Sequence, residues 1–165
     1  MHPKLLQELF ELLSGPLVLY ARGWCDYPDD AVQEAFIDLA NCSSDPKSPH
    51  AWLYTTTRRK AQNIARSEHR RRRHQRRAGE QADHWFRDSS LSTEWLPEDV
   101  AAALQQLSSD QREVVVARVW GELSFEQLAE VLDCSLSSAH RRYSAALKQL
   151  ESLLSIDAGQ TQLRT

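Results

Sequence analysis

Apolar residues recur at helical spacing along most of the chain, with interruptions that divide it into separate helices. The first apolar run, over residues 4–13, ends at Ser14, Gly15 and Pro16. Because glycine and proline interrupt helices, the pattern predicts one helix over 4–13 and another over about 17–24.

Residues 28–40 predict a third helix with one apolar side. Pro28 suits the first turn, where its missing N–H costs no hydrogen bond. The apolar side carries residues that recur at spacings of three and four: Val32, Ala35, Phe36 and Leu39. Gln33, Glu34 and Ile37 fall outside it. An exposed isoleucine beside these polar residues is a candidate partner contact, although single exposed apolar residues are common on protein surfaces.

After a loop over 41–50, a long helix is expected from about residue 49 into an arginine tract, with Ser48 as its cap. Its inner side would carry Leu53, Thr57, Ala61 and Ile64. Its opposite side would carry Thr55, Arg59, Gln62 and Arg66, with Trp52 and Asn63 beside them. Cations suit backbone phosphates, and a ring with amides suits exposed bases, although a lone tryptophan near a core is more often a packing residue.

The helical period is lost between Ala78 and about Trp95, where small and polar residues dominate. We interpret this stretch as a linker. The predicted fold is therefore all-α, with two small helical domains over 1–77 and 97–157 joined by a flexible linker over 78–96.

Two capping-box patterns, Ser108 with Gln111 and Ser124 with Gln127, mark helix starts in the second domain. The helix after Ser124 is short and stops at Asp133 and Cys134. A final helix follows, with an expected inward face of Leu136, Ala139, Tyr143, Ala146, Leu147 and Leu150. A short helix, a three-residue corner and a second helix with a polar outer side are typical of the helix-turn-helix, although a helical hairpin that does not bind DNA is the alternative.

The outward side of this last helix is polar and cationic, with Ser135, Ser137, Ser138, His140, Arg141, Arg142 and Ser144. In a helix-turn-helix, such side chains near the N-terminus of the second helix touch base edges. Arg141 is the expected base reader, because a guanidinium can donate two hydrogen bonds to guanine O6 and N7. Arg142 is expected to hold a phosphate, and His140 could do either.

Charge is distributed unevenly along the 165 residues, whose net charge is −3. From Arg58 to Arg77 there are ten Lys/Arg against one acid (+9), which leaves ten basic against 22 acidic residues (−12) elsewhere. Such a concentration of positive charge indicates a polyanionic partner, with a solvated charge run or a localisation signal as the alternatives.

Several classes of function find no support in the sequence. There is no apolar run of about 18 residues and no basic, apolar N-terminus typical of a signal peptide, so neither membrane insertion nor secretion is expected. The three cysteines are far apart and form no CxxC pair, which favours reduced thiols in the cytoplasm. Without a metal-ligand spacing, a Gly-rich phosphate loop or a nucleophile motif, we expect no enzyme, cofactor or metal site.

In order and spacing, these motifs resemble the extracytoplasmic-function group of the sigma-70 family of RNA polymerase sigma factors, along nearly the whole chain. "DDAVQEAFIDLA" is similar to region 2.2, whose D-x-VQE-x-F core maps onto Asp30, Gln33, Glu34 and Phe36. The resemblance implies that this segment binds the clamp helices of the polymerase's largest subunit, with contacts from Asp30, Gln33, Glu34 and Ile37.

"PHAWLYTTTRRKAQNIARSEHRRRR" is similar to the family's helix that engages and melts the −10 element. The DNA contacts implied there are Trp52, Thr55, Arg58, Arg59, Gln62, Asn63, Arg66 and Arg70. The segment 107–150 is similar to region 4, which binds the −35 element and the polymerase flap. In that region Asp133 and Cys134 stand where the family often has a glycine-led corner.

The resemblance thus implies an alternative sigma factor that binds core RNA polymerase and promoter DNA, with no cofactor. It also admits an anti-sigma factor as a further partner. The remaining alternative is a stand-alone helix-turn-helix regulator that does not bind the polymerase. It is disfavoured because the first domain shows no heptad seam or cofactor pocket and itself carries the basic tract.

Overall fold

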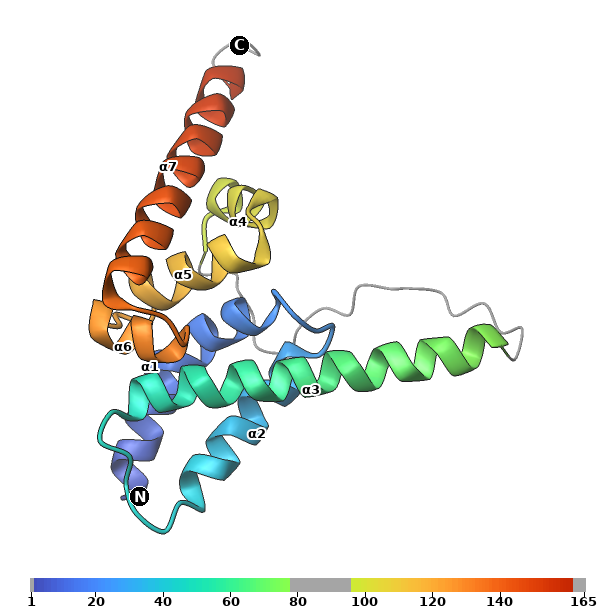
Figure 1. The fold of residues 1–165 in the computed structure, drawn as a ribbon, viewed down its shortest axis with the longest axis vertical. Coiled ribbons are helices and arrows are strands. Elements are labelled where there is room, and N and C mark those ends of the chain that lie inside the picture. The colour runs from blue at the N-terminus through green and yellow to red at the C-terminus, as the bar shows by residue number, and fades with distance from the viewer. Residues whose placement is uncertain (1, 78–95, 162–165) are drawn as a thin grey trace. The chain divides into compact units, whose positions relative to one another are not determined.

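The computed structural model describes residues 2–77 and 96–161, and within these ranges the chain forms seven α-helices and no strand (Figure 1). The all-α prediction is therefore confirmed. The chain divides into two compact units, Met1–Ser92 and Thr93–Thr165. Almost all of the linker expected over 78–96 lies outside the described residues. Within them, no helix combines the length and hydropathy needed to cross a membrane.

The first unit consists of α1 (Pro3–Ala21), α2 (Pro28–Ala40) and α3 (Pro49–Arg77), and each helix packs against the other two. Their shared core is apolar and fully buried: Leu13, Leu17, Val32, Ala35, Leu39, Leu53 and Ala61. The edge of Phe36 also meets Phe10 on α1, with ring centroids 5.0 Å apart. The inner sides expected of the helices over 28–40 and after residue 49 are thus confirmed.

The prediction that the first helix ends at Pro16 is wrong, because α1 continues through this proline to Ala21. Proline inside a helix removes a hydrogen bond and costs about 3 kcal/mol. The buried stripe Leu9, Leu13 and Leu17 crosses the interruption without a break. Burial of this stripe against α2 and α3 outweighs the local cost, as tertiary packing generally outweighs helix propensity.

The second unit consists of α4 (Glu98–Gln106), α5 (Ser109–Val119), α6 (Phe125–Val131) and α7 (Leu136–Thr161). α7 packs against the three other helices, and α5 packs against α6. Ser108 and Ser124 form the capping boxes expected from the sequence, each with a glutamine three residues later. These caps satisfy N–H groups that the first helical turn leaves without a partner.

The corner between α6 and α7 is built around Asp133, whose φ of 49° is left-handed. Cys134 N–H donates to the Ala129 carbonyl at 3.0 Å, which closes the end of α6. Ser135 then starts α7, because its Oγ accepts a hydrogen bond from Ser138 N–H at 3.3 Å. Aspartate tolerates a left-handed backbone better than most residues, so the tight turn forms without glycine.

Most of the inward face expected for α7 is confirmed: Ala139, Ala146 and Leu150 are buried, and Tyr143 and Leu147 are half-buried. The prediction is wrong for Leu136, which is 44% exposed. Leu136 is the first residue of α7, directly after the exposed corner residue Ser135, and the buried stripe begins only at Ala139.

Candidate protein-binding and nucleic-acid-binding surfaces

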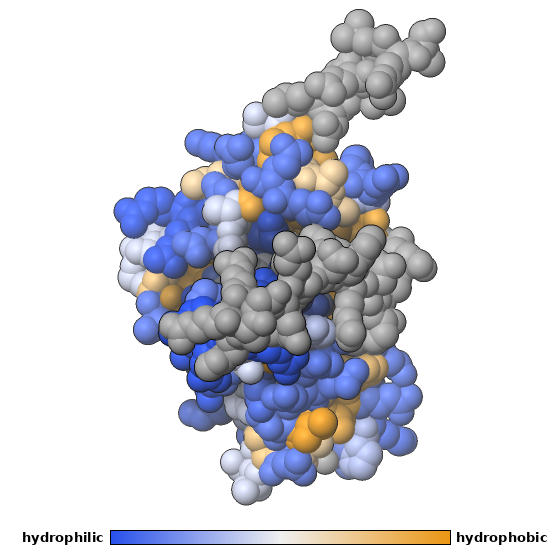
Figure 2. All heavy atoms as spheres, turned by 90° about the vertical axis from the view of Figure 1, so that its right-hand side faces the viewer, coloured by the Kyte–Doolittle hydropathy of each residue, from blue (hydrophilic) through white to orange (hydrophobic). Residues whose placement is uncertain are grey.

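Hydrophilic side chains dominate the face of the molecule seen in Figure 2, and the apolar side chains on this face gather only in small separate patches. Large apolar patches mark many binding sites. The candidate binding surfaces of this chain are instead mainly polar or charged, and they lie on the outer sides of α2, α3 and α7.

The outer face of α2 consists of Asp30, Gln33, Glu34 and Ile37, all of which are exposed. Ile37 is 58% exposed, which is common for a single apolar side chain, but its neighbours on this face are carboxylates and an amide. An exposed isoleucine between carboxylates and an amide offers a protein partner both apolar area and hydrogen-bond acceptors.

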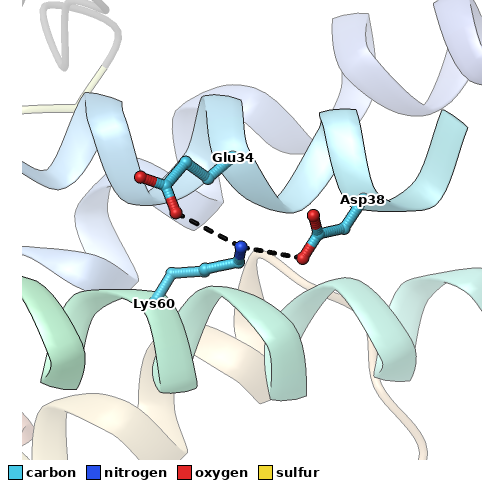
Figure 3. A network of polar contacts seen from close by, with 3 residues as sticks. All are labelled: Glu34, Asp38 and Lys60. Carbon is cyan, nitrogen blue, oxygen red and sulfur yellow. Dashed lines mark ion pairs between the residues drawn. The ribbon is translucent and has the colours of Figure 1, made fainter. Parts of the chain in front are cut away.

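Lys60 on α3 connects this face to the neighbouring helix (Figure 3). Its Nζ lies 3.2 Å from Oε2 of Glu34 and 2.8 Å from Oδ2 of Asp38. The hydrogen bond to Asp38 is the main reason why the pKa of Lys60 is raised, with a smaller contribution from Glu34. The ammonium therefore stays charged between the two carboxylates. In the sequence, Lys60 is distinguished only as part of the basic tract.

The polar face of α3 brings together most of the residues expected to contact nucleic acid. Arg59, Asn63, Arg66 and Arg70 are exposed, and Trp52, Thr55 and Gln62 are half-buried. Arg66 donates to Oδ1 of Asn63 at 2.5 Å and to the Gln62 carbonyl at 3.3 Å. The Thr55 hydroxyl donates to the Ala51 carbonyl at 2.9 Å. These contacts order a band of cations and amides along the helix.

Arg58 lies apart from this band, on the flank of α3 that faces the end of α1. Its guanidinium carbon is 6.0 Å from the ring centroid of Trp24. Trp24 meets the edge of Tyr20, and Tyr20 meets Tyr54, with centroids 4.9 and 4.8 Å apart. A cation over a tryptophan face is attracted by the ring. Arg58 therefore takes part in packing, and its expected contact with DNA stays a prediction.

Within the arginine tract, Arg72 pairs with Asp26 from the segment between α1 and α2. Arg70, Arg71 and Arg73 are exposed. Beside this pair, burial and the charge of Asp26 raise the pKa of Glu68. The tract is thus not uniform, because one arginine is engaged by the fold while its neighbours face solvent. No local pattern around Asp26 predicts this long-range pair.

The N-terminal part of α7 presents the polar side expected from the sequence. His140, Arg141, Arg142 and Ser144 are exposed. The hydroxyl of Ser135 lies 3.2 Å from that of Ser137 and donates to that of Ser138 at 2.9 Å. Hydroxyls and guanidinium groups gathered in one helical turn suit phosphates and base edges.

His140 is held by an aromatic contact that the sequence analysis missed. Its ring stacks on Phe125 of α6, with centroids 3.6 Å apart and planes 23° from parallel. Arg118 of α5 lies 4.9 Å from the same Phe125 ring, and Tyr143 meets it edge-on at 5.6 Å. The stack fixes the imidazole against α6, so His140 is less adjustable than Arg141 beside it. In the sequence, the only indication of this stack is the aromatic residue at the start of α6.

The described part of the chain holds no group of three or more His, Cys, Asp or Glu side chains that could ligate a metal ion. Burial raises the pKa of the Cys25 thiol to about 12. A thiol with so high a pKa stays protonated near neutral pH, which makes Cys25 a poor nucleophile and a poor metal ligand.

Comparison with known proteins matches both units to one family. Residues 9–77 match the family model "Sigma-70 region 2", and residues 98–150 match "Sigma-70, region 4". The chain is also similar to the ECF RNA polymerase sigma factor EcfG of Rhodopseudomonas palustris (strain TIE-1). The two are 33% identical over 146 residues, and the match covers 84% of this chain and 77% of that protein.

Two solved structures are also similar. The sigma factor RpoE, in complex with the anti-sigma factor NepR from Bartonella quintana, is 25% identical with a TM-score of 0.59, over 92% of this chain and 96% of that one. CnrH, in complex with the cytosolic domain of CnrY, is 24% identical with a TM-score of 0.57, over 94% and 91%. The likeness to CnrH concerns the fold.

Proposed function

This chain belongs to the extracytoplasmic-function sigma factors of the sigma-70 family, and from that membership we propose how its residues divide the work of promoter recognition. It is an alternative sigma factor that directs transcription initiation by core RNA polymerase. Sigma factors are not enzymes. The observation that carries this conclusion is the presence of both region 2 and region 4 in one chain, which a stand-alone helix-turn-helix regulator would lack.

We assign polymerase binding in the first unit to the outer face of α2. Asp30, Gln33, Glu34 and Ile37 are exposed on one helix and are not needed for the buried core. The clamp helices of the largest polymerase subunit would cover Ile37 and meet the carboxylates around it. Burial of an exposed apolar side chain among complementary charges is a common arrangement in protein interfaces.

The polar face of α3 is assigned to the −10 element. Arg59, Arg66 and Arg70 would neutralise phosphates, while the side-chain amide of Gln62 and the amide N–H groups of Asn63, whose Oδ1 accepts from Arg66, could meet bases. Trp52 is half-buried, so part of its ring can stack on an exposed base. Cations, amides and a ring on one helix suit a strand that is separated from its complement.

In the second unit α7 would enter the major groove of the −35 element. Arg141 is exposed near the N-terminus of the helix, where base edges come within reach. Ser135, Ser137, Ser138, Arg142 and Ser144 would position the helix on the backbone. His140, fixed on Phe125, would add a contact of limited reach. The proposed domains are 1–77 and 97–157, with 78–96 as the linker.

The partners of the chain follow from the same assignment. We propose as partners in initiation core RNA polymerase, through its clamp helices and flap, and promoter DNA, and a cytoplasmic location follows as part of the same proposal. The similar RpoE structure contains the anti-sigma factor NepR. We therefore include an anti-sigma factor among the partners of this chain.

The first prediction concerns the outer face of α2. Ile37→Ser should weaken binding to core RNA polymerase by about tenfold, because full burial of such a side chain contributes about 1.5–3 kcal/mol, a side chain 58% exposed has about half of that left to gain, and 1.4 kcal/mol is tenfold in affinity. Leu12→Ser is the matched control, since Leu12 is 59% exposed and Ile37 is 58% exposed. Titration of labelled sigma factor with core polymerase measures both. Equal losses in the two variants, or none in Ile37→Ser, would remove this face from the polymerase interface.

The second prediction separates the arginines of the tract. Arg70→Gln should lower the affinity of the holoenzyme for promoter DNA and reduce the slope of log affinity against log salt by about 0.7–0.9, the contribution of one phosphate in a single strand or a duplex. Arg72→Gln should leave that slope unchanged, because Arg72 pairs with Asp26. Fluorescence anisotropy across a salt series gives both slopes. A slope reduced equally by the two substitutions would show that the Asp26 pair does not withhold Arg72 from DNA.

The third prediction concerns base reading by α7. Arg141→Ala should relax the preference at one position of the −35 element, with a loss of about 1–3 kcal/mol of discrimination. Arg142→Ala should weaken all promoters about equally, since phosphate contacts carry little sequence information. Transcription from a library with every −35 base randomised measures the preferences of each mutant holoenzyme. Base preferences identical to those of wild type would exclude Arg141 as a reader.

A further inference from the structure

We propose that Lys60 is a positioning residue for polymerase binding, which holds the carboxylate of Glu34 in the orientation that the polymerase meets. The inference rests on the proposed role of the outer face of α2 and extends it to α3. It also assigns one cation of the basic tract to the polymerase side of the unit and not to a polyanionic partner.

The first support is the geometry of the ion pairs. Glu34 and Asp38 are four residues apart on α2, so their side chains lie one helical turn from each other. The Nζ of Lys60 reaches both, at 3.2 Å and 2.8 Å, from the neighbouring helix (Figure 3). Because the shorter contact is to Asp38, that carboxylate anchors the ammonium and the ammonium in turn orients Glu34.

The second support is the order of exposure. The side chain of Lys60 is 22% exposed, whereas that of Glu34 is 53% exposed. Figure 3 shows one oxygen of Glu34 directed toward Lys60 and the other directed away from it. A partner can therefore take the free oxygen from solvent without displacing Lys60, so the ion pair can persist in the complex.

The third support is the place of Lys60 on α3. Arg59 and Arg66 lie on the exposed polar face, whereas Lys60 turns toward the carboxylates of α2. Two of the three N–H donors of Lys60 are engaged by carboxylates, which makes it a poorer phosphate contact than Arg59 or Arg66. The positive charge of Lys60 instead lies beside the outer face of α2, where the polymerase is expected to bind.

The physical effect is preorganisation. A free glutamate loses rotamer freedom when a partner fixes it, and a glutamate already held by Lys60 loses less. Exposed ion pairs are weak, so we expect a modest effect on affinity rather than an essential contact. Ile37 beside Glu34 increases that effect, because a partner that covers Ile37 also excludes water from the ion pair.

A double-mutant cycle tests the proposal with the full chain and core RNA polymerase. Lys60→Met, which keeps an unbranched side chain one atom shorter and without charge, should lower affinity about three- to fivefold, whereas Lys60→Arg should stay within about twofold of wild type. In a Glu34→Gln background, Lys60→Met should change affinity by less than about twofold, because the carboxylate that Lys60 orients toward the polymerase is then absent. Lys4→Met, at an exposed lysine of α1, controls for the loss of one positive charge.

The outcomes separate this proposal from the assignment of the α2 face. A Glu34→Gln variant that binds normally would contradict that assignment and, with it, the role of Lys60. If Glu34→Gln binds weakly but Lys60→Met binds normally or more tightly, only the positioning role fails. An equal loss from Lys60→Met in both backgrounds would likewise overturn it. Thermal midpoints of all variants within about 2 °C of wild type, for a unit of this size, exclude a general loss of stability.

Discussion

The packing of α2 against α3 is the constraint on which both surfaces of the first unit depend. Val32 and Leu39 from α2 and Leu53 and Ala61 from α3 are completely buried, and this burial fixes the rotation of each helix about its axis. Once one stripe of a helix is buried, the opposite stripe must face outward. The outward face of α2 is therefore acidic and apolar, and the outward face of α3 is cationic. Two partners of different chemistry can be met by adjacent helices of one small unit, with Lys60 at their junction.

In the second unit, too, the buried residues of a helix determine which of its side chains face outward. Ala139, Ala146 and Leu150 hold α7 on the other helices, and the left-handed Asp133 sets where α7 begins. Arg141 is exposed because Ala139 is buried two residues earlier. At the start of the helix the hydroxyl of Ser135 bonds to those of Ser137 and Ser138, which orders the turn before any DNA is present.

Periodicity and capping predicted most of the helices, because apolar stripes and capping boxes are local signals. They failed at Pro16, where a stripe shared with two other helices outweighs the local interruption, and at Leu136, where a helix begins before its buried stripe does. The sequence placed most polar residues of α2 and α7 on exposed sides, since they follow from the buried stripes, but on α3 Trp52, Thr55 and Gln62 are half-buried and Arg58 packs on Trp24. It could not reveal the pairs of Lys60 with Glu34 and of Arg72 with Asp26, or the stack of His140 on Phe125, because these join residues of different elements.

Reconstituted transcription tests most directly whether this chain selects promoters through two units. Core RNA polymerase with the full chain would be supplied with a pool of DNA fragments, and the start sites would be mapped from the transcripts. Initiation should occur at defined sites that share two upstream sequence elements at a constant spacing, and it should require the chain. Transcripts no different from those of core polymerase alone, or sites that share a single element, would contradict a sigma factor that reads DNA with both α3 and α7.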